Sequence, residues 1–242
     1  MVLPIWLHWA TNEYCVCVMK SREPVKRRSY DSTRRRAQAD ETRAAVVRAA
    51  RDLFIERGYG NTTLTDIADL AGVSVETIHK SVGAKATLLH KAWDITVGGD
   101  QQDIVFHERP EVLAIRSEPD LARRLMLHAA FSTQTAKRIA PFQLMVQSAA
   151  GTDPAAAAML EEMGRQRLAG MTVMAAEAGK TGQLAVPEDE CRDVIWSMTD
   201  GMLWHRLVNE RGWTSDRFAE WLGRVWVDRL VKKPRRSPGK QR

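Results

Sequence analysis

Two short helical patterns separated by a glycine turn, in residues 62–89, constrain the fold of this chain more than any other stretch. Thr63 precedes the first pattern and Asp66 follows three residues later, so a hydroxyl and a carboxylate can form a capping box. Gly72 can take the positive φ that ends this helix, and Ser74 suits the N-cap of the next one. A buried first helix that positions a short exposed second helix is the plan of a helix-turn-helix.

The second helix, residues 75–81, is too polar and too short to be an ordinary core helix. We expect Ile78 and Val82 to face inward. Side chains expected to point outward are Glu76, Thr77, His79, Lys80 and Ser81. About seven residues at roughly 1.5 Å each form a rod of about 10 Å. Because the major groove of B-DNA is about 12 Å wide and admits an α-helix, the pattern predicts a helix that reads DNA.

A longer amphipathic helix is predicted directly before this motif, over residues 38–57, and Gly58 ends it. Val46, Ala50, Leu53 and Phe54 form one apolar stripe along it, while the charged residues lie mostly off the stripe. This helix would supply the third wall of a small helix-turn-helix domain.

The segment from about Arg43 to Asp94 resembles the N-terminal domain of the tetracycline-repressor (TetR) family of bacterial transcription regulators. The family's motifs occur here in order: Tyr59-Gly60 before Thr62-Thr63, Asp66-Ile67-Ala68, Ala71-Gly72-Val73-Ser74, and Gly83 two residues before Lys85. The chain departs from the family at three positions, where Tyr, Phe and Ser are replaced by His79, Val82 and Ala84.

The resemblance implies two sets of DNA contacts. Side chains expected at base edges or the groove wall are Ser74, Val75, Glu76, Thr77 and Lys80. Side chains expected at phosphates are Thr62, Thr63, His79 and Lys85. Helix N-termini and hydroxyl groups position the DNA backbone without reading its sequence, whereas side chains in the groove specify it. The alternative is a helix-turn-helix that makes only protein contacts.

The net charge of +6 is concentrated in two tails. Residues 20–36 carry eight Lys or Arg and two acids, and residues 232–242 carry six Lys or Arg and no acid. Since residues 1–19 hold a single acid, residues 37–231 have a net charge of −5. Basic segments suit phosphate binding, whereas an acidic body is repelled by it. For the C-terminal tail, the alternative is a segment that only keeps the protein soluble.

Residues 1–36 are predicted to be a disordered extension with a basic arm, because the arm is highly charged and has few apolar groups. Arg34, Arg35 and Arg36 directly precede the first helix, and such an arm can enter the minor groove of DNA. A solvated tail is the alternative. We expect residues 1–18 to be disordered, or not to be made because translation starts at Met19. Residues 232–242 are predicted to be a basic disordered tail.

The whole chain is predicted to be all-α, with about nine helices in two domains. Residues 37–97 form a helix-turn-helix DNA-binding domain with its connecting helix, and residues 98–231 form a helical effector-binding and dimerisation domain. Gly98 and Gly99 mark the end of the connecting helix and a hinge. The resemblance implies that this connecting helix joins the two domains and transmits ligand binding.

Eight of the ten Met residues fall between Met126 and Met202. Methionine fills irregular gaps and adapts to varied ligands, although an ordinary core is the alternative for any single one. We therefore expect an apolar pocket between helices, for a small apolar or amphipathic effector. The side chains expected to line it are Phe131, Phe142, Met145, Met163 and Met171.

Two amphipathic helices are predicted at the C-terminal end, one from Pro187 to Gly212 and one that Thr214 caps. Their apolar faces suit a four-helix interface between two copies of the chain, since one monomer core cannot easily hide both. The alternative is packing inside one monomer. The predicted interface residues are Ile195, Met198, Met202, Phe218, Trp221, Leu222, Val225 and Trp226.

Several classes of protein are excluded. Three cysteines, an odd and sparse count, argue against a disulfide framework and fit a reducing cytoplasm, and their spacing does not suit a metal site. No apolar run approaches the roughly 18 residues of a membrane span. The six histidines are scattered, with no nucleophile or metal constellation near them, so neither an enzyme nor a cofactor is expected.

The sequence therefore predicts a transcription regulator, and more specifically a repressor, that binds a palindromic double-stranded DNA operator as a homodimer. Its two recognition helices would read half-sites about 34 Å apart, or a multiple of that distance. An effector would release it by favouring a dimer whose spacing no longer matches the operator. The alternative is an effector-independent architectural or corepressor-like DNA-binding protein, with no cavity in residues 101–180.

Overall fold

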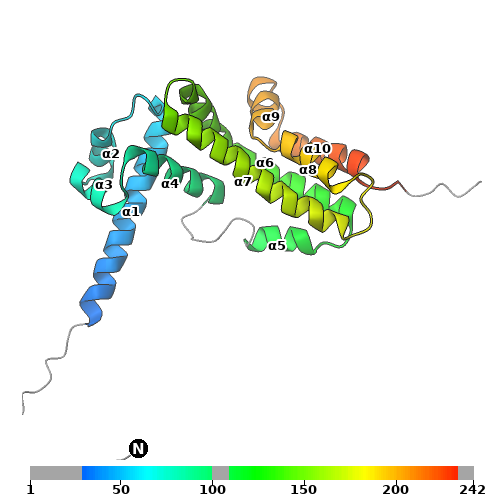
Figure 1. Cartoon of the computed structure of the whole chain (residues 1–242), viewed down its shortest axis with the longest axis horizontal. Helices are drawn as coiled ribbons and strands as arrows, with labels where there is room; N and C mark the ends of the chain where they lie inside the picture. Colours follow the sequence, from blue (N-terminus) through cyan, green and yellow to red (C-terminus); the bar gives the residue numbers. More distant parts are fainter. Residues whose placement is uncertain (1–28, 100–108, 234–242) are drawn as a thin grey trace, which may run out of the picture.

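The computed structural model describes residues 29–99 and 109–233, which are built from α-helices (Figure 1). The N-terminal group comprises α1 (Ser29–Arg57), α2 (Leu64–Ala71), α3 (Val75–Ser81) and α4 (Lys85–Gly98). The C-terminal group comprises α5 (Pro110–Ser117), α6 (Leu121–Ala150), α7 (Pro154–Gly179), α8 (Glu188–Met198), α9 (Met202–Trp204), the π-helical turn η2 (His205–Glu210) and α10 (Ser215–Leu230). The predicted all-α class is confirmed. Residues 1–28 and 234–242, where most of the two predicted tails falls, lie outside the described residues.

Helix α1 begins nine residues earlier than the predicted helix, so Arg34, Arg35 and Arg36 are helical. The prediction of a disordered arm up to residue 36 is therefore wrong for residues 29–36. No Gly or Pro interrupts residues 29–57, and Arg, Ala, Gln and Glu all have high helix propensity. The stretch over residues 33–41 is exposed on every side and projects from the body of the molecule (Figure 1).

A first hydrophobic core joins the N-terminal helices to one end of α6 and α7. Trp93 of α4 packs on Phe142 of α6, with ring centroids 5.8 Å apart, and donates a 2.9 Å hydrogen bond from its indole to Gln166 of α7. The largest wholly buried members of this core are Phe54, Ile67, Ile78, Leu88, Leu89, Phe142 and Met159. The core thus crosses the predicted boundary at residues 97 and 98, although α4 does end there, at Gly99 in a left-handed conformation.

A second hydrophobic core lies at the other end of α6, against α8 and α10. Its wholly buried members include Leu121, Leu125, Ile195, Phe218, Leu222, Trp226 and Leu230. The absence of a side chain at Gly223 lets α10 approach α6 closely, because an added Cβ atom would lie 2.5 Å from the sulfur of Met126. Because α6 contributes residues to both cores, it connects the N-terminal helices to the C-terminal ones.

The single helix predicted from Pro187 to Gly212 is broken after Met198. The Asp200 carboxylate accepts the backbone N–H groups of Met202 and Leu203, at 2.9 and 3.3 Å, and so begins a new helix. Gly201 between them has φ 79° and is packed against Ile139 of α6. An Asp-Gly pair is a helix-breaking signal, but the apolar spacing on either side outweighed it in the prediction. Because of this break, the described residues contain more helices than the nine predicted.

The end of α10 pairs with the loop between α7 and α8. The Lys232 amide donates to the carbonyl of Gln183 at 2.9 Å, and the Lys232 ammonium group donates to Gly182 at 2.7 Å. The prediction of a disordered tail is therefore wrong for Lys232. Among the helices of residues 29–99 and 109–233, none is long and apolar enough to cross a membrane.

Candidate DNA-binding interface

The caps predicted around the helix-turn-helix are present. The Thr63 side chain accepts the Asp66 amide at 3.1 Å, while its own amide donates to the Asp66 carboxylate at 2.8 Å. The hydrogen bonds that the Thr63 hydroxyl and amide donate to the Asp66 carboxylate, more than the nearby charge of Arg57, lower the pKa of Asp66. Gly72 ends α2 with φ 67°, and Ser74 caps α3 by accepting the Thr77 amide at 3.1 Å. The direction of α3 is therefore set by local hydrogen bonds at both ends of the turn.

Helix α3 shows one buried face and one polar exposed face. Ile78 is wholly buried in the first core, and Val75 packs against that core from a partly buried position. The exposed positions are Ser74, Glu76, His79 and Lys80. The side chain of Val75 therefore packs partly against the protein, although a contact with the DNA groove was predicted for it. The four exposed side chains remain available to a ligand.

Neighbouring polar groups on α3 bind one another. The hydroxyl groups of Ser74 and Thr77 lie 2.9 Å apart, and the Lys80 ammonium group lies 2.6 Å from the Glu76 carboxylate. Both side chains of this ion pair are about three-quarters exposed, at 75% and 73%. Exposed pairs of this kind contribute little stability, so separating them in order to contact bases costs little.

Thr62 is a structural residue, and its predicted phosphate contact is wrong. Its side chain is 1% exposed, and its hydroxyl donates to the carbonyl oxygens of Gly58 at 2.9 Å and Leu53 at 3.2 Å. The hydroxyl thus ties this turn to carbonyl groups at the C-terminal end of α1. Thr63, one residue later, is exposed at the N-terminus of α2 and keeps its proposed role.

Lys85 lies at the first position of α4, with its ammonium group 4.2 Å from the centroid of the Tyr59 ring. Partial burial lowers its pKa, an effect that the negative charge of Asp153 opposes. Ala84 precedes it as an N-cap without a side-chain hydrogen bond. Resting on Tyr59 preorganises this cation at a helix N-terminus, which suits it to an anionic partner.

Arg43 is a residue of this site that sequence reasoning did not assign. Its guanidinium donates to the Ser81 carbonyl at 3.2 Å and pairs with Asp40 at 3.3 Å. It therefore joins α1 to the C-terminal end of α3 and satisfies a carbonyl group there. No sequence signal could have identified it, because its role depends on how α1 crosses α3.

The five side chains predicted to line an effector pocket do not form one. Phe142, Met145 and Met163 belong to the first core, whereas Met171 packs against the second core at the other end of α7. Phe131 is partly buried on α6 and belongs to neither group of core residues. The prediction failed because methionine spacing identifies inward faces without showing which helix covers them.

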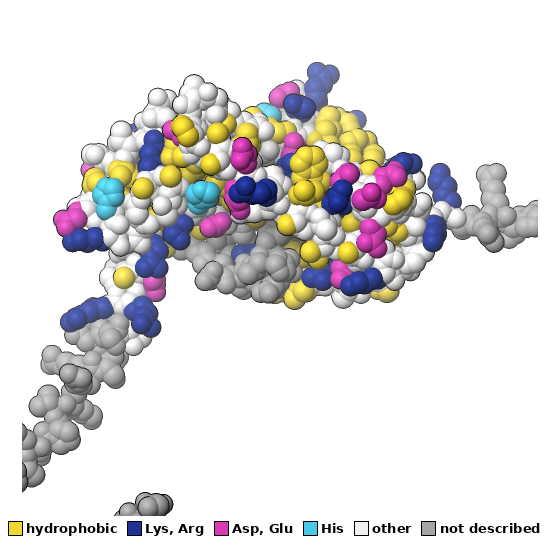
Figure 2. All heavy atoms as spheres, in the orientation of Figure 1, with side chains coloured by type: hydrophobic (Ala, Val, Ile, Leu, Met, Phe, Trp, Pro, Cys, Tyr) yellow, Lys and Arg dark blue, Asp and Glu magenta, His cyan; other side chains and the backbone are white. Residues whose placement is uncertain are grey.

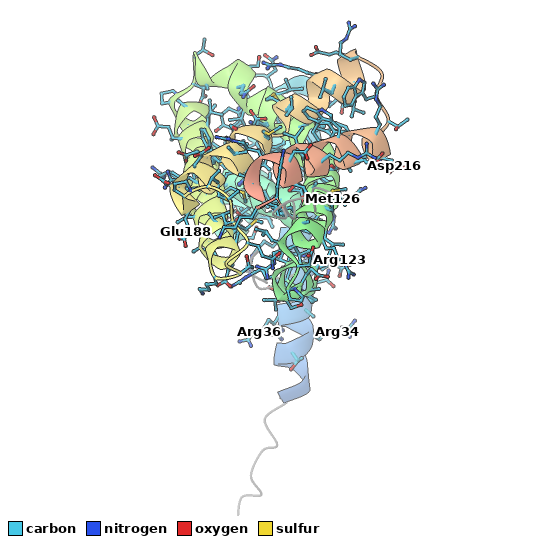
Figure 3. All side chains as sticks on the ribbon, turned by 90° about the vertical axis from the view of Figure 1, so that its right-hand side faces the viewer. Arg34, Arg36, Arg123, Met126, Glu188 and Asp216 are labelled. Carbon is cyan, nitrogen blue, oxygen red and sulfur yellow. The ribbon has the colours of Figure 1, made fainter. Side chains whose placement is uncertain are left out.

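A hollow of about 490 Å³ lies elsewhere, between α6 and α10. Its floor is apolar and its rim is charged, and Figure 3 shows Arg123 and Met126 on the α6 side. The lining residues are Ala122, Arg123, Met126, Leu127, Arg224, Val227 and Asp228. Both arginines bind acids, Arg123 at 3.5 Å from Glu118 and Arg224 at 2.5 Å from Glu220.

Five of the eight predicted dimer-interface residues are buried within the single chain instead, which corrects the prediction. Ile195, Met202, Phe218, Leu222 and Trp226 are at most 8% exposed, because α7 packs on α8 and α6 packs on α9 and α10 within the chain.

The other three, Met198, Trp221 and Val225, are only partly buried. Apolar side chains gather on the face over α9 and α10 in Figure 2. Partly buried apolar residues that pack on the second core there are Leu203, Leu207, Val208, Trp213 and Trp221. A residual apolar surface therefore does exist at this end of the molecule.

Metal and nucleophile chemistry find no support among the described residues. No group of three or more His, Cys, Asp or Glu side chains in residues 29–99 and 109–233 could hold a metal ion. The Cys191 thiol is buried in the second core, and burial raises its pKa to about 11. A buried thiol with a raised pKa fills space in the core and does not act as a nucleophile.

Sequence relatives share the N-terminal part of the chain. A model of the family described as bacterial regulatory proteins, tetR family, matches residues 46–92. The HTH-type transcriptional regulator TtgR of Pseudomonas putida is 43% identical over 61 residues, and the HTH-type transcriptional repressor BepR of Brucella suis is 48% identical over 46 residues. These matches span 25% and 19% of this chain, but only 29% and 22% of the relatives' own lengths.

Solved structures share the fold over most of the chain. NalD of Pseudomonas aeruginosa, the secondary repressor of the MexAB-OprM multidrug efflux pump, has a TM-score of 0.57 at 18% identity, covering 80% of this chain and 98% of NalD. A putative transcriptional regulator from Saccharomonospora viridis in complex with choline has a TM-score of 0.60 at 19% identity, covering 80% of this chain and all of the other. Residues 46–92 are therefore similar to the N-terminal domain of the tetR family of bacterial regulatory proteins, and the chain shares its fold with these solved structures.

Proposed function

We propose that this chain is a DNA-binding transcription regulator that acts as a repressor, binding a palindromic operator as a homodimer. The observation that carries the proposal is the placement of α3. Helix α2 packs against it, Ser74 caps it, and the exposed side of α3 bears Glu76, His79 and Lys80. An α-helix with one exposed polar face fits the major groove, where side chains at base edges specify sequence.

The division of contacts follows from exposure. Ser74, Glu76, Thr77 and Lys80 are proposed to meet base edges, with Val75 at the groove wall through its exposed edge. Thr63, His79 and Lys85 are proposed to hold phosphates from helix ends that flank α3. Positive helix N-termini at α2 and α4 add to the attraction for phosphate.

Dimerisation is supported by the residual apolar surface around α9 and α10. Met198, Trp221 and Val225 remain partly exposed there beside the partly buried Leu203 and Leu207. Contiguous apolar surface on a soluble chain marks an interaction site. A two-fold axis through this surface would present two copies of α3 to half-sites about 34 Å apart, or a multiple of that distance.

A small apolar or amphipathic effector is proposed to release the operator. The α6–α10 hollow supports the proposed effector, because its volume lies within the range of small-ligand sites and its lining is mainly apolar. The solved relative that contains choline shows that this fold can accommodate a small organic ligand. An effector at α6 could act on the DNA-binding helices through the first core, which α6 shares with α4.

A second candidate function, effector-independent DNA binding, is favoured by one specific observation. Phe142, Met145 and Met163, which were expected to line an effector pocket, are packed inside the first core. Such a protein would need no internal ligand site, and it would bind its operator equally in the presence of any metabolite.

Selection of bound sequences from random DNA duplexes, repeated with a metabolite panel, tests the proposal. We expect a palindromic consensus whose half-sites lie one or more helical turns apart, and at least one apolar or amphipathic compound that releases it. Release by no compound would leave the effector-independent candidate. The absence of any two-fold symmetric consensus at every salt concentration would contradict the dimeric reader.

A further inference from the structure

The projecting first part of α1 is a surface whose role the helix-turn-helix does not explain. Residues 33–41 are exposed on every side. Arg34, Arg35 and Arg36 lie on a single turn near the tip of this segment, and Asp40 and Glu41 lie nearer the body. Asp40 pairs with Arg43, which leaves the tip as the more strongly positive part. We refer to residues 33–41 as the basic rod.

The helical state of the rod excludes the minor-groove insertion expected of a flexible arm. An α-helix with its side chains is about 10–12 Å across, whereas the minor groove of B-DNA is about 6 Å wide. The rod can therefore meet DNA only from outside this groove. The contacts available to it there are phosphate oxygens.

The rod begins where α1 touches the C-terminal end of α3. Arg43 donates to the Ser81 carbonyl at 3.2 Å, and this contact fixes the position of α1 beside the proposed recognition helix. From Arg43 to Arg34 the helix advances nine residues, or about 13.5 Å at roughly 1.5 Å per residue. That length corresponds to about four base pairs at 3.4 Å each. The tip can thus reach DNA beyond the base pairs that α3 covers.

The orientation of the arginines shows how the tip could be used. Arg34 and Arg36 project to opposite sides of the helix in Figure 3, as expected for positions about 200° apart on an α-helix. A helix that carries a cation on each side can contact two phosphate strands at once. Guanidinium groups suit this task because they bind phosphate oxygens in a bidentate manner.

The geometry points to a second DNA contact, which rests on the proposed function: the basic rod lies across the outside of the minor groove next to each half-site, with Arg34 and Arg36 on the phosphates of its two walls. This contact adds affinity for DNA that flanks the operator without reading its sequence. It also compensates for the near-balanced charge of the helix-turn-helix. That segment carries two lysines, Lys80 and Lys85, and three acidic residues, Asp66, Asp69 and Glu76.

The test compares operator duplexes with about two and about eight base pairs beyond each half-site, at several salt concentrations. We expect the wild-type protein to bind the longer duplex more tightly and with a steeper salt dependence. Each phosphate contact contributes about 0.9 to the slope of log affinity against log salt. An R34Q/R36Q dimer lacks four such contacts, so its slope on the long duplex should fall by about 3.6, while its affinity for the short duplex should change little.

Matched variants separate a rigid rod from a flexible arm or a general charge effect. A37P removes an amide donor and breaks the helix between the tip and the body, so it should abolish the gain from longer flanks, whereas A37S should keep it. R165Q/R229Q makes the same change of charge on exposed arginines of α7 and α10 and should also keep it. Replacement of A·T by G·C pairs in the flanks should have no effect.

Three results would overturn the proposal: no gain from longer flanks in the wild-type protein, a gain that survives A37P, or a gain that requires A·T pairs. The second and third would indicate a flexible arm inside the minor groove. Failure of the proposed function has a different signature, because the wild-type protein would then bind neither duplex specifically at any salt concentration.

Discussion

The two hydrophobic cores differ in what they connect. The first core joins α1–α4, the helices that present the proposed DNA-reading surface, to one end of α6 and α7. The second core joins the other end of α6 to α8 and α10, below the residual apolar surface. Helix α6 is shared, with Phe142 in the first core and Leu125 in the second. A shift of α6 therefore cannot occur without a change in both cores, since packed interiors transmit strain.

The cores also differ in how their polar groups are satisfied. Trp93 in the first core donates its indole N–H to Gln166, whereas the indole N–H groups of Trp204 and Trp226 in the second core have no partner. Buried unpaired polar groups lower stability. Two such indole groups therefore lie in the second core.

The largest expected effect comes from removing the aromatic link in the first core. Phe142→Ala should lower the free energy of unfolding by about 3–5 kcal/mol, because Phe142 is wholly buried against Trp93. It should also raise amide hydrogen exchange in α4 more than elsewhere. Urea unfolding and hydrogen exchange measure the two effects. Leu222→Ala in the second core is the control, and equal exchange in α4 for both variants would show that the cores do not differ in this respect.

The next effect is a pH dependence specific to the second core. His128 is buried and stacks on Trp226, with ring centroids 5.3 Å apart, and burial lowers its pKa from 6.5 to about 4. The unfolded chain therefore binds this proton at higher pH than the folded chain does, so stability falls as pH drops from about 6.5 to about 4. At about 1.4 kcal/mol per pH unit, the loss reaches about 3 kcal/mol.

His128→Phe keeps the aromatic contact with Trp226 and should remove this part of the acid destabilisation. Urea titrations at pH 7 and pH 4.5 on both proteins measure it, and comparison with the variant subtracts the carboxylates that also titrate in this range. An identical loss of stability in the two proteins would mean that the imidazole is not kept neutral by burial.

A smaller effect is expected at the edge of the first core, from Thr62. Thr62→Val removes the hydrogen bonds to Leu53 and Gly58 and should cost about 1–2 kcal/mol of stability. Operator affinity and its salt dependence should be unchanged for the folded fraction, because the hydroxyl faces the protein. A fall of about one in the salt slope for each copy would instead restore Thr62 as a phosphate ligand.

The parts of the fold that sequence analysis predicted correctly are local. The capping box of Thr63 and Asp66, the left-handed Gly72 and the Ser74 cap all depend on residues within a few positions of one another. The break at Gly201 is also local, and its Asp-Gly signal was outweighed by the apolar spacing on either side.

The incorrect predictions concern which element covers an apolar face. Trp226 and Ile195 lie on faces that the sequence marks as apolar, where a second copy of the chain was expected. Within one chain, α6 packs on the helix that carries Trp226, and α7 packs on the helix that carries Ile195. In the same way, Met145 and Met171 face inward at opposite ends of α6 and α7, in different cores. Periodicity identifies a buried face, but the partner of that face depends on contacts far apart in the chain.

The smallest effect on stability is expected on α3 itself. Lys80 and Glu76 form a highly exposed ion pair, so Lys80→Ala should change the free energy of unfolding by less than about 0.5 kcal/mol. Its effect on DNA recognition should be far larger than its effect on the fold. This contrast makes it the most suitable variant for testing the proposed reading surface.

The most direct test is a measurement of wild-type and Lys80→Ala affinities for every single-base variant of the selected operator. We predict that Lys80→Ala loses discrimination of about 1–3 kcal/mol at one base pair, at the same position in both half-sites, and keeps it elsewhere. Uniform weakening across all variants, with every base preference retained, would contradict the assignment of α3 as the reading helix.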